Sequence, residues 1–157
     1  MDRLQQRMYF FVPYNISEIQ KGIQAGHAAL EYASLYGHLQ SYKDFIKHDK
    51  TWIILNGGTT RSYALATDFN TSPGSLDEIS FLLNENYIPH SKFYEPDLGY
   101  CLTAVCFLAD ESVWDKENYP DYVENDVTSY YQWKKIVMKN NDKNIFIRTL
   151  LEGKRLA

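Results

Sequence analysis

The chain is poor in the residues and patterns that mark several large classes of protein. It has only two cysteines, Cys101 and Cys106, in 157 residues, which excludes a disulfide-based scaffold. In a strand these positions point to opposite faces, so we expect two buried thiols in a reducing compartment. The longest apolar run, 102–109, is far too short to span a bilayer, and the first residues lack a signal-peptide pattern. We therefore expect a soluble, cytoplasmic protein.

Several catalytic signatures are missing as well. The four histidines, His27, His38, His48 and His90, share no metal-ligand spacing, so we expect no metal and no cofactor. No G-x-S-x-G motif and no Walker motif occurs, which disfavours the hydrolases and NTPases built on them. The net charge of −4 disfavours non-specific nucleic-acid binding.

The elements that are present alternate between strand and helix patterns. Short β-rich runs occur at 8–12, 51–55, 91–94 and 102–108, and helical patterns at 17–36, 39–46, 75–83, 127–139 and 144–151. The run 61–67 is either a fifth strand or an irregular connection. This order predicts a single α/β domain with three layers, α/β/α, around a mixed sheet of four to five strands. The run 102–108 is apolar on both faces, so we place it centrally in the sheet.

Two connections contain residues that indicate how the chain turns or a helix starts. Asn56-Gly57-Gly58 is typical of a hairpin turn. The alternative is that its backbone amides, with Thr59 to Arg61, cradle a phosphate. Further on, Ser75 followed by Glu78 has the spacing of a helix N-terminal capping box.

The helix expected from Ser17 to about Gly37 organises the rest of the chain. Ser17 can cap it, with Gln20 completing a capping box, and Gly37 can end it. An apolar stripe, formed by Ile19, Ile23, Gly26, Leu30 and Ala33, is expected to face the core. Gly22, Ala25 and Ala29 lie beside that stripe and would allow another element to approach closely.

A polar row follows the same helix at the edge of the expected buried face. Its members are Gln20, Gln24, His27 and Glu31, spaced at intervals of three and four residues. They are either an ordinary boundary layer or one wall of a functional site.

Two stretches resemble a known family. The sequence Gln24-Ala-Gly-His27-Ala-Ala29 resembles the helix motif of type 2 peptidyl-tRNA hydrolases, the archaeal and eukaryotic type. The stretch from Glu95 through Asp97 to Thr103 resembles the family's second signature, an aspartate-containing turn before an apolar strand. The resemblance covers about residues 8–110 and leaves 111–157 as a helical extension. It implies cleavage of the ester that joins a peptide to the tRNA 3′ end.

The resemblance also implies roles for particular residues. His27 would orient or shuttle a proton, and Asp97 or Glu95 would hold the attacking water. The remaining contacts to the ligand would come from Gln20, Gln24, Glu31 and Thr103. The family's helix lysine falls at Gln20 here. Lys21 follows one place on and is the third candidate catalytic residue, with His27 and Asp97. It lies about 100° around the helix from Gln20, so it cannot simply replace that lysine.

A second hypothesis follows from the missing lysine and the acidic charge. The pocket would bind a nucleotide-like small molecule, such as a host signal, without cleaving it. The arrangement of the chain is similar to small proteins of tailed bacteriophages, which would place it in the host cell cytoplasm. We expect the C-terminal helices to pack on the sheet in cis, with 115–126 as an ordered crossing. The alternative is a homodimer built from those helices.

Overall fold

The fold is built on a four-stranded mixed sheet. The computed structural model describes residues 3–61, 73–121 and 143–157. The strands are β1 (Gln6–Pro13), β2 (Trp52–Gly58), β3 (His90–Glu95) and β4 (Cys101–Asp110), in the order β2-β1-β4-β3. β1 runs parallel to β2, while β4 is antiparallel to both of its neighbours. The central position predicted for the run 102–108 is confirmed.

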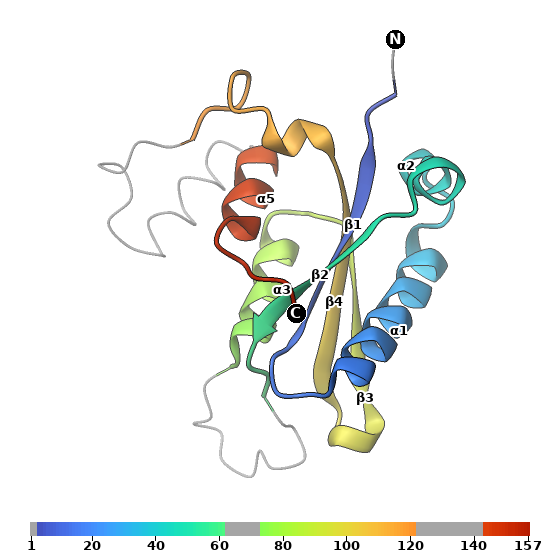
Figure 1. Ribbon diagram of the computed structural model, residues 1–157, viewed down its shortest axis with the longest axis vertical. Helices are drawn as coiled ribbons and strands as arrows, with labels where there is room; N and C mark the ends of the chain where they lie inside the picture. Colours follow the sequence, from blue (N-terminus) through green and yellow to red (C-terminus); the bar gives the residue numbers. More distant parts are fainter. Residues whose placement is uncertain (1–2, 62–72, 122–142) are drawn as a thin grey trace.

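Helices cover both faces of this sheet (Figure 1). They are α1 (Glu18–Tyr36), α2 (Gln40–Asp44), α3 (Ser75–Glu85) and α5 (Lys143–Leu151), and a π-helical turn, Phe45–Asp49, follows α2. In Figure 1, α1 lies on one side of the sheet and α3 and α5 on the other. The predicted α/β fold with helices on both faces is confirmed. In the described part of the chain, no helix combines the length and apolarity needed to cross a bilayer.

The two faces follow from the alternation of side chains along β1. Met8, Phe10 and Val12 pack in the cluster beneath α1. Tyr9 and Phe11 point the other way, into the larger cluster that contains residues of α3 and α5. Successive side chains of a strand alternate between faces, so a wholly apolar strand must be covered on both sides.

The C-terminal helix α5 is part of the main core. Phe146, Ile147, Leu150 and Leu151 are buried in the same cluster as Tyr9, Phe11 and Phe107. The predicted packing of 144–151 on the sheet in cis is therefore confirmed. The helix expected at 127–139, the end of the crossing, and most of the run 61–67 lie outside the described residues.

The Gly57-Gly58 pair does not form the predicted hairpin turn. Both glycines end β2, which pairs in parallel with β1. The start of α3 crosses there at close range: the Gly57 carbonyl accepts a 2.7 Å hydrogen bond from Ser75 Oγ. An added Cβ on Gly57 would lie 2.8 Å from Leu76. Gly58 has a φ of +82°, which favours glycine. Glycine is therefore required at position 57 by close packing and favoured at position 58 by its backbone conformation.

The start of α3 also differs from the prediction. Its N-cap is Gly74, and the helix begins at Ser75. Asp77 accepts hydrogen bonds from the backbone amides of Gly74 and Arg61, each at 2.9 Å. The Ser75 hydroxyl instead donates to the end of β2. This tertiary hydrogen bond replaces the local capping bond that the sequence predicts.

The bounds predicted for α1 are confirmed, but the predicted buried face is wrong. Ser17 Oγ caps the helix by accepting from the Gln20 amide, and Gly37 follows its last residue. The buried residues are Gln24, Ala25, Ala28 and Tyr32. The apolar stripe lies on the opposite side: Ile19 is 77% exposed, Ile23 44% and Leu30 71%. Small residues bring α1 close to the sheet, and its larger aliphatic residues face outward.

An ion pair joins the start of the chain to the turn after α2. Arg3 donates to both carboxylate oxygens of Asp49, at 2.6 and 2.8 Å, and the Gln6 amide adds a third hydrogen bond. The hydrogen bond from Arg3 is the largest effect, and together these contacts lower the pKa of Asp49 from 3.8 to about 2.

We predict that acid releases this stabilisation. The pKa of Asp49 is lower in the folded than in the unfolded protein, so its contribution is complete above about pH 4 and is lost as the pH falls towards 2. Asp49→Asn should remove that pH dependence from the free energy of unfolding, measured by urea titration at several pH values. The control is Asp44→Asn. An unchanged acid profile for Asp49→Asn would contradict the prediction.

Candidate functional site

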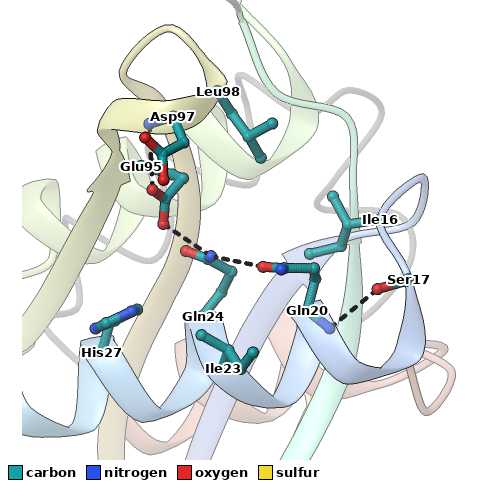
Figure 2. Close-up of a pocket in the computed structure, with 9 residues that line it drawn as sticks. All are labelled: Ile16, Ser17, Gln20, Ile23, Gln24, His27, Glu95, Asp97 and Leu98. Atoms are coloured by element: carbon teal, nitrogen blue, oxygen red, sulfur yellow. Dashed lines mark hydrogen bonds between the residues drawn. The ribbon is translucent and has the colours of Figure 1, made fainter.

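A cleft opens between the N-terminal half of α1 and the turn that joins β3 to β4 (Figure 2). Its volume is about 410 Å³. The residues that line it are Ile16, Ser17, Gln20, Ile23, Gln24, His27, Glu95, Asp97 and Leu98. Five of the residues proposed from the sequence, Gln20, Gln24, His27, Glu95 and Asp97, therefore meet in one cleft.

The side chain of Gln24 connects the parts of this cleft. It is 1% exposed, and its amide nitrogen donates to Glu95 Oε2 at 2.9 Å and to Gln20 Oε1 at 3.2 Å. Its amide oxygen accepts from Thr103 Oγ1 at 2.6 Å. Figure 2 shows both bonds that Gln24 donates: the bond to Gln20 stays within α1, and the bond to Glu95 joins α1 to the end of β3. Gln24 thus holds Glu95 in place.

Thr103 reaches Gln24 because of an irregularity in the sheet. The register between β3 and β4 shifts between Phe93, opposite Ala104, and Tyr94, opposite Leu102. Thr103 falls in this bulge, so both Thr103 and Ala104 face α1. Thr103 is 1% exposed and lies beneath the cleft. From that position it supports Gln24, and it is not among the residues that line the cleft.

The two carboxylates lie at the start of a short 3₁₀ turn, Pro96–Leu98. Glu95 precedes the turn and caps it, because its Oε1 accepts from the Asp97 amide at 3.2 Å. Gly99 ends the turn with a φ of +68°, where glycine costs least. Asp97 is exposed at the rim, whereas Glu95 is half-buried and is the carboxylate bonded to Gln24.

His27 forms part of the wall of the cleft on α1. Its ring stacks on Phe93 with centroids 4.3 Å apart and planes inclined by 17°. The ring is half-buried, and Figure 2 shows it on the same side of α1 as Gln24. This stacking fixes the ring plane, and the residue lines the cleft. His27 can therefore donate or accept a hydrogen bond or a proton in the cleft.

Two residues proposed from the sequence lie elsewhere. Lys21 does not line the cleft and forms a 2.9 Å ion pair with Glu18. Glu31 is exposed and does not line the cleft. The position of Lys21 follows from the helical geometry, since it is about 100° from Gln20 around the axis.

The lining of the cleft has an acidic character. Glu95 and Asp97 line it, and no lysine or arginine does so among the described residues. The ion pairs of the described residues leave both carboxylates without a cation within 4 Å. The cleft therefore disfavours an anionic group and favours one that donates hydrogen bonds or carries positive charge.

Some lining residues were not identified from the sequence. Ile16, Ile23 and Leu98 form the apolar part of the walls, and Phe93 supports His27 from behind. Their types are common in any core, so they gave no signal of function. The sequence of β3 offers two large aromatic residues, Phe93 and Tyr94, as possible stacking partners for His27.

Comparison with models of known protein families gives no match for this chain, and comparison with curated proteins gives none. The resemblance to type 2 peptidyl-tRNA hydrolases therefore stays a prediction.

Proposed function

We propose that the cleft binds a small nucleoside-like molecule and holds it without cleaving it. The observation that carries this proposal is the Gln24 network, which presents a fixed set of hydrogen-bonding groups beside apolar walls. Pockets of a few hundred Å³ with a few positioned polar groups are typical of small-molecule sites.

The groups in the cleft suit a base or a ribose better than a phosphate. Glu95 and Asp97 accept hydrogen bonds, such as those from the N–H groups of a base or the hydroxyls of a sugar. The oxygen of Gln20 is engaged by Gln24, so the Gln20 amide nitrogen is left to donate. Any phosphate of the ligand would extend out of the cleft, away from the two carboxylates.

Calorimetric titration tests this proposal. The ligands are nucleosides, their monophosphates, cyclic dinucleotides, ADP-ribose derivatives and tRNA. We expect nucleosides to bind as tightly as their phosphates do. Glu95→Gln should weaken binding about 10–100-fold, the effect of a lost hydrogen bond to a charged group. The ligand should be recovered unchanged after denaturation.

Lys21→Ala is the matched control. Lys21 is a cation that directly follows the cleft residue Gln20 in sequence, but it does not line the cleft. Binding should be unaffected by this change. Much tighter binding of the phosphorylated ligands, lost in Lys21→Ala, would show that the proposed mode of binding is wrong.

Hydrolysis of peptidyl-tRNA or a related nucleotide ester is the second candidate, favoured by the position of His27. A water held by Glu95 or Asp97 could lose its proton to His27, and the Gln20 amide could donate to the developing oxyanion. The test is release of tRNA from N-blocked aminoacyl-tRNA, with His27→Ala and Asp97→Ala as comparisons. Wild-type protein that gives no turnover above buffer excludes this activity.

A further inference from the structure

The outward face of α1 differs from that of an ordinary surface helix. Ile19, Ile23 and Leu30 form one stripe and are exposed, and no described element covers them. Gly22 and Gly26 lie in or beside the same stripe, and an added Cβ on either would meet nothing within 4 Å. A surface helix normally turns its apolar stripe inward. Exposed apolar patches of a few hundred Å² are often functional, so this stripe is a candidate interaction surface.

We propose that this stripe, Ile19 to Leu30, pairs with the same stripe on a second copy of the chain. The argument is the arrangement of large and small residues along it. Ile19 and Leu30 are equally distant from the midpoint between Gln24 and Ala25, and so are Ile23 and Gly26. When two α1 helices pack antiparallel about a two-fold axis, residues equidistant from the midpoint face one another.

This pairing is complementary in shape. Ile23 of each copy fits over Gly26 of the other, where the bare backbone leaves room for it. Ile19 of each copy contacts Leu30 of the other at the two ends. Large residues face small ones in the middle, as in ridges-into-grooves packing.

The contact area that α1 offers sets the expected affinity of the dimer. The 19 residues of α1 form a helix about 28 Å long and about 10 Å wide, which presents on the order of 300 Å². Stable interfaces use about 800 Å² per partner. We therefore expect a weak, reversible dimer that forms at micromolar to millimolar concentration.

The cleft lies at the edge of this interface. Ile23 belongs both to the exposed stripe and to the lining of the cleft. Glu31 and Gln20 lie on the same flank of α1, about 20° apart around the axis. In the antiparallel pair, Glu31 of one copy faces Glu18 of the other, which lies between the cleft-lining residues Ser17 and Gln20. The second copy thus brings a carboxylate close to the rim of each cleft.

A charge-swap experiment tests the pairing, with the full chain studied by sedimentation velocity from about 1 μM to about 1 mM. Ile19→Lys and Leu30→Glu should each weaken self-association at least tenfold. An equimolar mixture of the two variants should associate at least tenfold more tightly than either alone. In the mixed pair the introduced lysine faces the introduced glutamate at one end, and the wild-type contact of Leu30 with Ile19 remains at the other.

Two further variants separate association from folding. Gly26→Gln introduces a better helix former, so it should raise the melting temperature while weakening the dimer at least tenfold. Leu35→Gln changes an exposed leucine of α1 outside the stripe, and it should leave association unchanged. The proposal is overturned if wild-type protein stays monomeric to the highest concentration. It is also overturned if the mixture associates no better than the separate variants.

Discussion

A fragment that ends at Asp110 is expected to remain unfolded. It keeps all four strands but loses α5, which buries Phe146, Ile147, Leu150 and Leu151 against the sheet. Burial of such a side chain contributes about 1.5–3 kcal/mol. The sum for these residues is comparable with the about 5–15 kcal/mol that stabilises a typical domain. The part of this apolar face that α5 covers would be left open to water, while α3 would still cover the rest.

Thermal unfolding followed by circular dichroism measures this effect. The matched control ends at Gly153, because it keeps α5 and removes only the last residues. It loses the hydrogen bonds of Arg155 and Ala157 to β2, which are 2.8 and 2.9 Å long, so it should fold with a modestly lower melting temperature. A fragment 1–110 that melts cooperatively at the wild-type temperature would show that α5 is dispensable.

Arg148→Met is expected to cost on the order of 3 kcal/mol of folding free energy. Arg148 is fully buried. Its guanidinium donates to the Val113 carbonyl at 2.9 Å, to the Tyr119 carbonyl, and to Asp121 Oδ1 at 3.0 Å. Methionine fills a similar volume but leaves two carbonyls and one carboxylate without this donor. The effect stays below that of a fully buried pair because Asp121 is 44% exposed.

Urea denaturation with Arg148→Met and Arg148→Lys checks this expectation. Lysine keeps the charge but cannot direct donors to three acceptors in a fixed plane, so it should recover only part of the loss. Asp121→Asn keeps an acceptor for Arg148, so it should lower the free energy of unfolding by less than either substitution of Arg148. A midpoint for Arg148→Met equal to that of the wild type would mean that the buried guanidinium contributes no net stability.

The sequence predicts much of the fold because strong local signals agree with it. The apolar runs at 8–12 and 102–108 became the two central strands. Ser17 and Gly37 marked the ends of α1 correctly. These signals depend on neighbouring residues only, through backbone propensity and capping, and are therefore readable without tertiary information.

The buried face of α1 could not be predicted from such local signals. Periodicity shows which side of a helix is apolar, but not which side the sheet will cover. Here the sheet covers the side with Ala25, Ala28 and Tyr32, which lets the backbone of α1 approach closely. Gln24 is buried there because Thr103, Glu95 and Gln20 satisfy its amide.

The candidate site was predicted in part. Helical spacing placed Gln20, Gln24 and His27 in one row, and the resemblance suggested Glu95 and Asp97 as their partners. The structure brings these residues into one cleft, while their function stays a prediction. The supporting position of Thr103 depends on the bulge in β4, which only the pairing with β3 reveals.

The bond between Thr103 and Gln24 has a consequence for what the cleft can discriminate. A hydroxyl has a single proton, and Thr103 gives it to the oxygen of Gln24. The nitrogen end of the amide must then face Glu95, so the direction of the whole chain of hydrogen bonds is fixed. With valine at this position the oxygen of Gln24 would lose its donor, and the amide would be held in this orientation from the Glu95 side, because a carboxylate accepts and cannot donate. The order of donors and acceptors that the cleft presents to a ligand therefore depends in part on Thr103, which does not line the cleft.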